Sequence, residues 1–512
     1  MKRQGQNSPG RLPSWSPPET GRRNWATPTA LVAVLVWQTA LGVKAQEAAA
    51  PVALVVTNNP SHPTSLPTEE DDPGPKQLKE KVRIVVNTNA PAGDATDKKT
   101  FHWKWSCEGW NGLYLEVAQQ SPLGDVFAPL RHQAGLTNPV FHLEKVEMTS
   151  RIGGRMAVDA AGFANSGNFE DFDGGVQLRR LRLFLRGDCI LLLPVSYQIE
   201  LGYIPNQFNV EESYLIFRDL GFLGTLKLGQ YRTPFSLNAY TSSRDIRFME
   251  PAAPVTALAP GVNAGFQVGR SVLGDRMTWT TGLFGDGGSS DAGDASQDYG
   301  RAVIRLTGLP IATKATDDPA SQQLLHLGLN FNWLYSASAS VRYRTRPESN
   351  LAPYVLDTGD IDAKSAFMLD AESAWVNGPF SLQGEFLAGQ VNEVSGGEPV
   401  FYGFYAQAGW FLTGESRPYN RREGRFGRIV PRHDFAWKGG GWGAWEVLGR
   451  FSYTDLNDGD VNGGRMGLFT AGINWHPTSH VHWAFNFITG KVNSPDDKGW
   501  MNIFETRVEV DL

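Results

Sequence analysis

The last nine residues, Phe504-Glu505-Thr506-Arg507-Val508-Glu509-Val510-Asp511-Leu512, decide the fold. Charged residues stand at the even-spaced positions Glu505, Arg507, Glu509 and Asp511, and the residues between them are apolar except for a threonine. Successive side chains of an extended strand point to opposite faces, so a period of two indicates a strand with two unlike faces. The segment therefore predicts a β-strand with one apolar face and one charged face.

The same alternation of apolar and polar residues continues upstream as far as Ser150. Val481, Trp483, Phe485 and Phe487, for example, alternate with polar His482 and Asn486. Turn residues separate these segments, and two-faced alternation of this kind predicts strands throughout. We expect sixteen strands, at 150–162, 176–188, 193–204, 210–218, 223–232, 262–270, 276–285, 299–307, 323–335, 361–376, 379–391, 400–412, 443–454, 465–475, 480–490 and 501–512.

A soluble sandwich and a membrane barrel would both show this alternation, and two features favour the barrel. The segments are longer than the five or six residues usual in globular proteins. Aromatic residues gather near their ends, as the interfacial girdles of a membrane barrel require; they include Trp333, Tyr335, Trp375, Trp410, Phe411, Trp442, Trp445, Trp475 and Trp483. The fold class predicted is all-β, a transmembrane antiparallel β-barrel of about sixteen strands in residues 150–512.

The residues before the barrel predict export. Arg22 and Arg23 precede the apolar run 30–37, and Val43-Lys44-Ala45 offers small residues at a cleavage site, which together are typical of a signal peptide over 1–45. The alternative is a membrane anchor, but so short a run cannot cross about 30 Å of hydrocarbon as a helix. Residues 46–99 are rich in Pro, Ala and Asp and predict a disordered linker. Residues 100–149 are either a short plug or a periplasmic lead-in to the barrel.

Composition excludes several other classes of protein. A net charge of −6, from 47 basic and 53 acidic residues, excludes a globally basic nucleic-acid binder. Two cysteines are too few for a disulfide framework or a multi-cysteine metal site. Some outer-membrane barrels are proteases or lipases, but no HExxH, GxSxG or phosphate-binding glycine motif occurs. We therefore expect no enzyme, no cofactor and no metal.

Several stretches, in this order, resemble the phosphate-selective porins of the O and P type. They are Ile152-Gly153-Gly154-Arg155, residues 179–187 (RRLRLFLRG), 228–236 (LGQYRTPFS), 378–385 (GPFSLQGE), 411–415 (FLTGE), 443–446 (GAWE), 450–458 (RFSYTDLND) and 472–475 (GINW). The resemblance implies a sixteen-stranded porin of the bacterial outer membrane, a homotrimer with inward-folded loops and a basic path for small anions, phosphate above all. No motif places the family's binding arginines and lysines residue by residue.

The alternation itself selects candidates for the anion path. Arg180, Arg182 and Arg186 share one face of their strand while leucines occupy the other, which puts these arginines in the lumen about 7 Å apart for each two-residue step. Lys227, Arg301 and Arg305 should point inward for the same reason. One interpretation is a ladder that replaces part of an anion's hydration. The other is a solvated wall, whose charges pair with the inward acids Glu200, Glu385 and Glu446.

Two connections are candidates for segments that narrow the lumen. The outward connection 233–261 contains Arg244 and Arg247 and is stiffened by prolines; it is either a constriction loop or an ordinary surface loop. The periplasmic connection 417–438 is strongly basic, and is either a turn that folds into the lumen or a solvated loop; its candidates are Arg421, Arg422, Arg425 and Arg428.

Cys107 and Cys189 both fall on the periplasmic side and form one disulfide or remain two thiols. The function expected is passive uptake of small anions, phosphate or related oxyanions, by a barrel that contacts outer-membrane lipid and no nucleic acid. The alternatives are a general diffusion porin and a structural or adhesive barrel.

Overall fold

The computed structural model describes residues 101–107, 113–119, 146–169, 172–190, 194–204, 207–285, 299–313, 322–336 and 340–512. All of them belong to one compact unit, Lys76–Leu512. The predicted signal peptide (1–45) and linker (46–99) lie outside the described residues, so both stay predictions.

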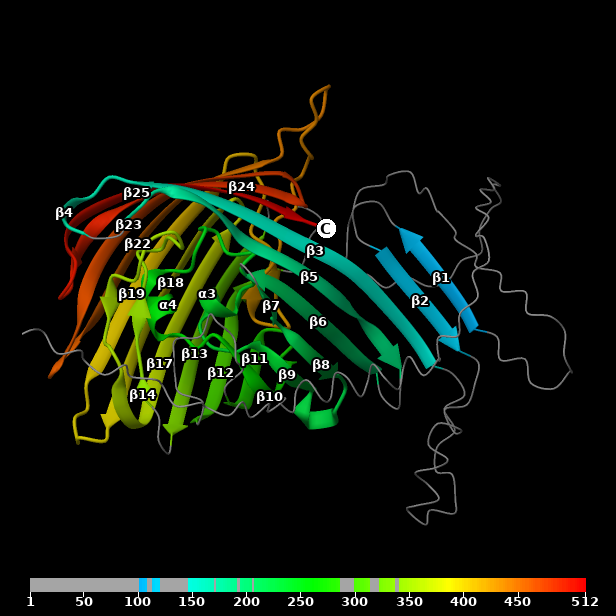
Figure 1. The fold of residues 1–512 in the computed structure, drawn as a ribbon. Coiled ribbons are helices and arrows are strands. Elements are labelled where there is room, and N and C mark those ends of the chain that lie inside the picture. The colour runs from blue at the N-terminus through cyan, green and yellow to red at the C-terminus, as the bar shows by residue number, and fades with distance from the viewer. Residues whose placement is uncertain are drawn as a thin grey trace, which may run out of the picture. The chain divides into compact units, whose positions relative to one another are not determined.

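Within the described ranges, sixteen antiparallel strands form the barrel (Figure 1). They are β3 (Val146–Phe163), β5 (Gly175–Ile190), β6 (Pro194–Ile204), β7 (Gln207–Val210) with β8 (Ser213–Phe217) as one broken strand, β9 (Thr225–Arg232), β10 (Val262–Val272), β11 (Met277–Gly285), β12 (Tyr299–Ala312), β13 (Gln323–Ser336), β17 (Ile361–Asn377), β18 (Phe380–Glu393), β19 (Val400–Phe411), β22 (Ala444–Asp458), β23 (Val461–Thr478), β24 (Val481–Asn493) and β25 (Lys498–Asp511). Each predicted strand corresponds to one of these, with ends that agree within a few residues.

The first and last strands of the barrel pair with each other. β25 lies antiparallel to β3, from Ile503 opposite Phe163 to Asp511 opposite Arg155. This pairing closes the sheet, and Figure 1 shows the cyan β3 beside the red β25. A closed sheet leaves no edge strand with unpaired backbone groups. The predicted all-β antiparallel barrel is confirmed.

The two faces of the sheet are the reverse of those of a soluble protein. On β25, Phe504 is 59% exposed on the outer face, whereas Arg507 is 3% exposed on the inner face. On β19, Phe404 and Trp410 are exposed while Gln407 is buried. An apolar outer face around a charged interior is the arrangement expected of a barrel surrounded by lipid.

Three connections fold into the lumen. Loop 233–261 contains α3 (Leu237–Tyr240) and α4 (Ala253–Leu258), and α4 packs against β18, β19 and β22 inside the ring of strands (Figure 1). Loop 340–357 contains β14 (Ser340–Val341), β15 (Arg344–Thr345) and β16 (Leu356–Asp357), and Leu356 is fully buried. Hairpin 419–426 is formed by β20 (Tyr419–Asn420) and β21 (Arg425–Phe426). The inward-folded loops that the family resemblance implied are confirmed.

Short elements complete the described chain. β4 (Ser166–Asn168) pairs with β25, and η2 (Gly221–Leu223) precedes β9. None of the helices within the described ranges has the length and apolar character needed to cross a membrane.

The segment predicted as a lead-in to the barrel contains a strand pair. β1 (Phe101–Cys107) pairs with β2 (Leu113–Gln119), and β2 pairs with the first residues of β3, from Gln119 opposite Val146 to Leu113 opposite Ile152. The first barrel strand therefore begins at Val146, four residues before the expected boundary.

Of the two alternatives for Cys107 and Cys189, a disulfide or two thiols, the strand order argues against the disulfide. Cys189 carries a free, half-buried thiol. The strand order β1, β2, β3, β5 puts two strands between the two cysteines, so their backbones are about 14 Å apart across the sheet. A disulfide requires Cα atoms within about 7 Å. The side chain of Cys107 is not among those described.

We expect an arginine on the outer face to destabilise the barrel according to its depth in the bilayer. Leu329 lies on the outer face in the middle of β13, and Leu325 lies near the end of the same strand. Leu329→Arg should cost about 2–4 kcal/mol, and Leu325→Arg about 0–1 kcal/mol. Equilibrium urea unfolding of the protein folded into lipid vesicles measures both. Equal costs at the two positions would contradict the assignment of this face to lipid.

Candidate functional site

The arginines predicted on the second strand point into the barrel, but they are paired with carboxylates. Arg182 forms ion pairs with Glu200 at 2.8 Å and with Glu211 at 3.2 Å. Arg180 is 6% exposed and lies 3.8 Å from Glu250. The sequence allowed two interpretations of these arginines, an anion ladder and a wall of paired charges. The surroundings of Arg180 and Arg182 agree better with the wall of paired charges.

A β-bulge adds an arginine that the alternation did not predict. The register between β3 and β5 shifts between Ala157, opposite Arg180, and Val158, opposite Leu178, so Arg179 has no partner residue on β3. A bulge re-aims side chains in this way. Arg179 consequently reaches Glu250 inside the barrel, at 2.9 Å, although strict alternation places it on the lipid face.

Glu250, in loop 233–261, is the acceptor for three arginines. Besides Arg179 and Arg180 it contacts Arg507 of β25 at 2.6 Å, and Arg507 also pairs with Asp159 at 2.7 Å. Burial alone would raise the pKa of Glu250, but the three arginines outweigh it and hold that pKa well below its usual range. These contacts tie the loop to β5 and to β25, the strands on either side of β3.

The other predicted path residues also point inward and have partners. The Lys227 ammonium lies between the rings of Tyr214 and Tyr231, at 3.7 and 4.0 Å from their centroids. Arg305 is 2% exposed, pairs with Glu372 at 2.6 Å and donates to the Gly424 carbonyl of hairpin 419–426 at 2.8 Å.

Loop 233–261 is fixed to the far wall by polar contacts. Arg247 pairs with Glu446 of β22 and contacts Ser381 of β18. The Ser236 hydroxyl and the Asn238 backbone N–H donate to the Glu385 carboxylate at 2.5 and 2.7 Å. Because the loop crosses the lumen from β9 to β18 and β22, the structure places the expected constriction segment inside the barrel.

Loop 340–357 is fixed by one buried ion pair. Glu348 accepts from Arg450 of β22 at 2.5 Å, from Ser452 at 2.7 Å and from Thr470 of β23 at 2.8 Å. It also accepts from the Ala253 backbone N–H at 3.1 Å, at the start of α4. Glu348 therefore joins two inward loops to the wall.

The basic periplasmic connection enters the lumen through hairpin 419–426. Arg417 stacks on Phe426 at 3.4 Å and donates to Gln383 of β18 at 2.6 Å; burial lowers the pKa of Arg417 to about 9. Gly424 has φ of 65°, and a Cβ atom there would meet Thr307, Arg305 and Thr278 at 2.9–3.0 Å. Only glycine fits this close approach.

The four predicted arginines of this connection have different surroundings. Arg425 pairs with Glu423 of the same hairpin, and Arg421 donates to the Thr313 carbonyl. Arg422 is the outermost, with a side chain 80% exposed that pairs with Asp275 at 3.4 Å. Arg428 follows the hairpin and pairs with Asp511.

Two of the predicted arginines, from two different predicted groups, pair with Asp511, and a third from the remaining group lies near them. Arg244 of loop 233–261 lies 3.2 Å from Asp511 and 2.8 Å from Asp245; Arg428 also pairs with Asp511. Arg186 of β5 is close enough to feel the charges of Arg244, Asp511 and Arg151. We call Arg186, Arg244, Arg428, Asp245 and Asp511 the mouth cluster.

The charge of the mouth cluster is on balance positive. The three guanidinium groups of the cluster outnumber its two carboxylates, and Arg151 adds a further positive charge nearby. Burial and then the repulsion of Arg244 lower the pKa of Arg428. The cluster borders a small open hollow, which is lined by Arg244, Arg428, Ile429, His476, Ser479, His480, Val481, His482, Glu509 and Asp511.

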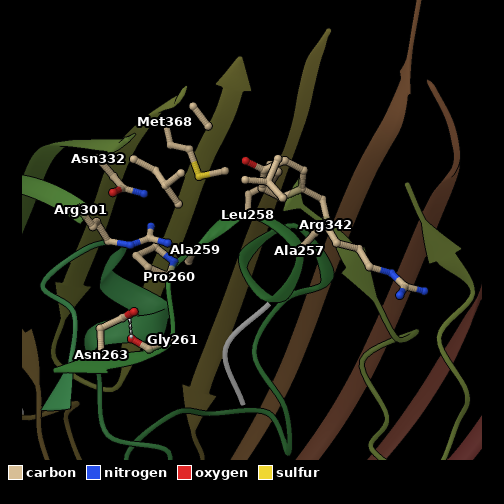
Figure 2. Close-up of a pocket in the computed structure, with 14 residues that line it drawn as sticks. Ala257, Leu258, Ala259, Pro260, Gly261, Asn263, Arg301, Asn332, Arg342 and Met368 are labelled. Carbon is tan, nitrogen blue, oxygen red and sulfur yellow. Dashed lines mark hydrogen bonds between the residues drawn. The ribbon is translucent and has the colours of Figure 1, made fainter. Parts of the chain in front are cut away.

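A second open hollow lies where loop 233–261 returns to β10. Figure 2 shows Arg301 with its guanidinium group beside Ala259 and Pro260, whereas the guanidinium group of Arg342 points away from the other labelled residues. Arg342 instead pairs with Asp357 at 2.5 Å. Apolar side chains, including Leu258 and Met368, make up much of the remaining wall.

Comparison with known proteins gives one family and several relatives. Residues 151–511 match the family model described as phosphate-selective porin O and P. An uncharacterised protein of Caulobacter vibrioides is 30% identical over 329 residues, which are 61% of this chain and 62% of that protein. Porin O of Pseudomonas aeruginosa is 24% identical over 411 residues, 71% of this chain and 88% of that protein. The solved anion-selective porin from Comamonas acidovorans aligns with a TM-score of 0.44 at 13% identity, over 72% of this chain and 100% of its own.

Removing the Glu348 carboxylate should destabilise the protein strongly. Glu348→Ala leaves Arg450, which is 1% exposed, without its ion pair, and a buried charge stripped of its partner costs about 3–5 kcal/mol. Asp357→Ala removes the half-exposed partner of Arg342 in the same loop and should cost about 1 kcal/mol or less. Chemical unfolding in vesicles compares the two variants. Similar losses for both would refute the role of Glu348 as the anchor.

Proposed function

Because the chain belongs to the phosphate-selective porin O and P family and is a porin of the bacterial outer membrane, we propose that it carries small anions passively through its lumen. Phosphate and related oxyanions are the proposed substrates. The observation that carries this proposal is the mouth cluster, where arginines of β5, loop 233–261 and the connection after hairpin 419–426 meet beside a hollow.

The chemistry of the mouth cluster suits an oxyanion. A channel must replace part of the hydration of an ion by fixed charge, and must hold the ion weakly enough to release it. Guanidinium groups present paired N–H donors that match the oxygens of phosphate. Asp511 and Asp245 already occupy some of these donors, so an entering anion competes with carboxylates that stay in place. This competition favours passage over tight retention.

The proposal assigns different roles to the other inward arginines. Arg180, Arg182, Arg247 and Arg305 are paired with carboxylates and hold the wall and the inward loops in position. Arg301, beside the second hollow, is the proposed contact for anions at the other side of loop 233–261. The anion path is thus carried by fewer arginines than the alternation alone suggested.

A general diffusion porin is the second candidate function. The observation that favours it is the number of arginines already neutralised, such as Arg182 by two glutamates. In that case the mouth cluster is wall charge without an anion preference. A structural barrel would have no conductance at all. We place the protein with channels and not with enzymes, in agreement with its family.

Reversal potentials in a KCl gradient test the anion preference. The purified protein in planar bilayers should favour chloride, and added phosphate should block the current in a saturable manner.

One unit charge at about 5 Å in water is worth about 0.8 kcal/mol, so Arg428→Ala should weaken phosphate block about fourfold. Arg422→Ala, which removes an exposed arginine of the same connection, should leave block unchanged. A reversal potential near zero, or equal block in both variants, would remove the proposal.

We also propose that the porin is a homotrimer, as the family resemblance implies. Light scattering of the detergent-solubilised protein should give three times the mass of one chain after subtraction of the bound detergent. A mass of one chain would overturn this assembly without affecting the anion preference, because the mouth cluster is built from residues of a single chain.

A further inference from the structure

A group of three carboxylates stands on the inner wall, apart from the mouth cluster. Asp370 and Glu372 belong to β17 and Glu385 belongs to β18, and one oxygen of each lies within 4.8 Å of the others. All three are buried: Asp370 is 0% exposed, and Glu372 and Glu385 are each 3% exposed. We call them the acidic triad.

Strand register makes the triad unfavourable unless something neutralises it. Glu372 and Glu385 lie directly opposite each other on neighbouring strands. Like charges in this position repel each other, and burial increases the cost because the surroundings screen poorly. Arg305 compensates Glu372, at 2.6 Å. Within the described residues, no lysine or arginine forms an ion pair with Asp370 or Glu385.

The neighbouring side chains account for only part of the triad's hydrogen bonding. Glu385 accepts from Ser236, Asn238 and Tyr405, and Glu372 contacts His326 at 3.0 Å. Asp370 receives one contact, from the Asn330 amide nitrogen at 2.5 Å, and its Oδ1 atom has no partner. An unpaired carboxylate oxygen on a fully buried side chain is costly.

A fourth side chain gives an independent indication that a ligand belongs here. Asn330 lies opposite Asp370 on β13, is 0% exposed, and reaches both Asp370 and Glu372 with its amide nitrogen. Its Oδ1 atom has no hydrogen-bond partner. A half-turn of this amide exchanges its nitrogen and oxygen, and the oxygen then faces the carboxylates. That orientation is favourable when a cation stands between the amide oxygen and the carboxylates, or when one of the carboxyl groups carries a proton.

We propose that Asp370, Glu372, Glu385 and Asn330 form a binding site for one calcium ion. Carboxylate and amide oxygens are the ligands that Ca²⁺ prefers, at about 2.3–2.6 Å. Two oxygens on opposite sides of such an ion stand at most about 5 Å apart, which agrees with the separation within the triad. Mg²⁺ demands near-ideal octahedral geometry and resists losing its water. Zn²⁺, Cu²⁺ and Ni²⁺ prefer imidazole or sulfur ligands.

The position of the site gives the ion a structural and an electrostatic role. Glu385 holds the start of α3 through Ser236 and Asn238, so an ion on Glu385 braces loop 233–261 against β17 and β18. The ion also converts an acidic patch of the lumen wall into a neutral one, which favours anions nearby. Binding itself is independent of the proposed anion preference and is measured without any transport assay.

Terbium luminescence tests the site on the full-length folded protein in a neutral detergent. Tb³⁺ stands in for Ca²⁺, and the hydroxyl of Tyr405, hydrogen-bonded to Glu385, places a sensitising ring beside the site. We expect sensitised emission that Ca²⁺ displaces and that Mg²⁺ displaces poorly. Asp370→Asn should weaken Tb³⁺ binding at least roughly tenfold, since affinity follows the number of charged ligands. The control is Asp362→Asn, at an exposed position of the same strand, and should bind as the parent does.

A second variant keeps the test decisive if Asp370→Asn fails to fold. Asn330→Asp supplies a fourth carboxylate and should tighten Tb³⁺ binding roughly tenfold. If protons shared among the carboxylates neutralise the triad instead, Asn330→Asp binds Tb³⁺ no more tightly than the parent. That result, unaltered binding by Asp370→Asn, or emission that Ca²⁺ does not displace would each overturn the proposal. The heat-dependent shift in electrophoretic mobility confirms that each variant is folded.

Discussion

The absence of hydrogen-bond partners in lipid is the constraint on which the rest of this structure depends. Every backbone N–H and C=O group at membrane depth must be paired within the protein, so a sheet in lipid has to close on itself. The pairing of β25 with β3 meets this requirement. Once the sheet is closed, the alternation of each strand assigns one face to lipid and the other to the lumen. The sequence of β25, apolar outside and charged inside, is the direct consequence.

Closure also creates an interior in which charged side chains need partners. Arg450, Arg305 and Arg507 are each nearly inaccessible, and each forms an ion pair. A buried charge is costly unless it is paired and hydrogen-bonded. Arg450 pairs with Glu348 and Arg507 pairs with Glu250, so contacts that neutralise the interior also fix the loops that narrow it. In the mouth cluster, as around Glu250, the guanidinium groups outnumber the carboxylates.

The sequence predicted the strands well because a strand is a local pattern. Alternation over a dozen residues identified all sixteen, and their order predicted which residues face the lumen. What it missed depends on contacts between distant segments. Strict alternation put Arg179 on the lipid face, and nothing local reveals the bulge that turns it inward. Glu250 and Glu348 looked like ordinary loop residues, yet their partners Arg507 and Arg450 are 257 and 102 positions away.

The sequence left the pairing of the two cysteines open for a related reason, since a shared location at one end of the barrel does not imply adjacent strands. Cys189 is on β5 and Cys107 on β1, with β2 and β3 between them. The sequence likewise did not predict the acidic triad. Glu385 was expected to face the lumen, but its position opposite Glu372 follows from the register of β17 and β18, which the sequence does not state.

The anchoring of loop 233–261 has a consequence for the order of folding. The loop leaves β9 early in the barrel, but Arg247 pairs with Glu446, 199 positions later, and Glu250 pairs with Arg507 of the last strand. Contacts of such high sequence separation form slowly, because the intervening chain must be ordered first. Loop 233–261 can therefore adopt its final position only after the carboxyl-terminal strands have formed. We therefore expect closure by β25 and completion of the channel interior to occur together, late in folding.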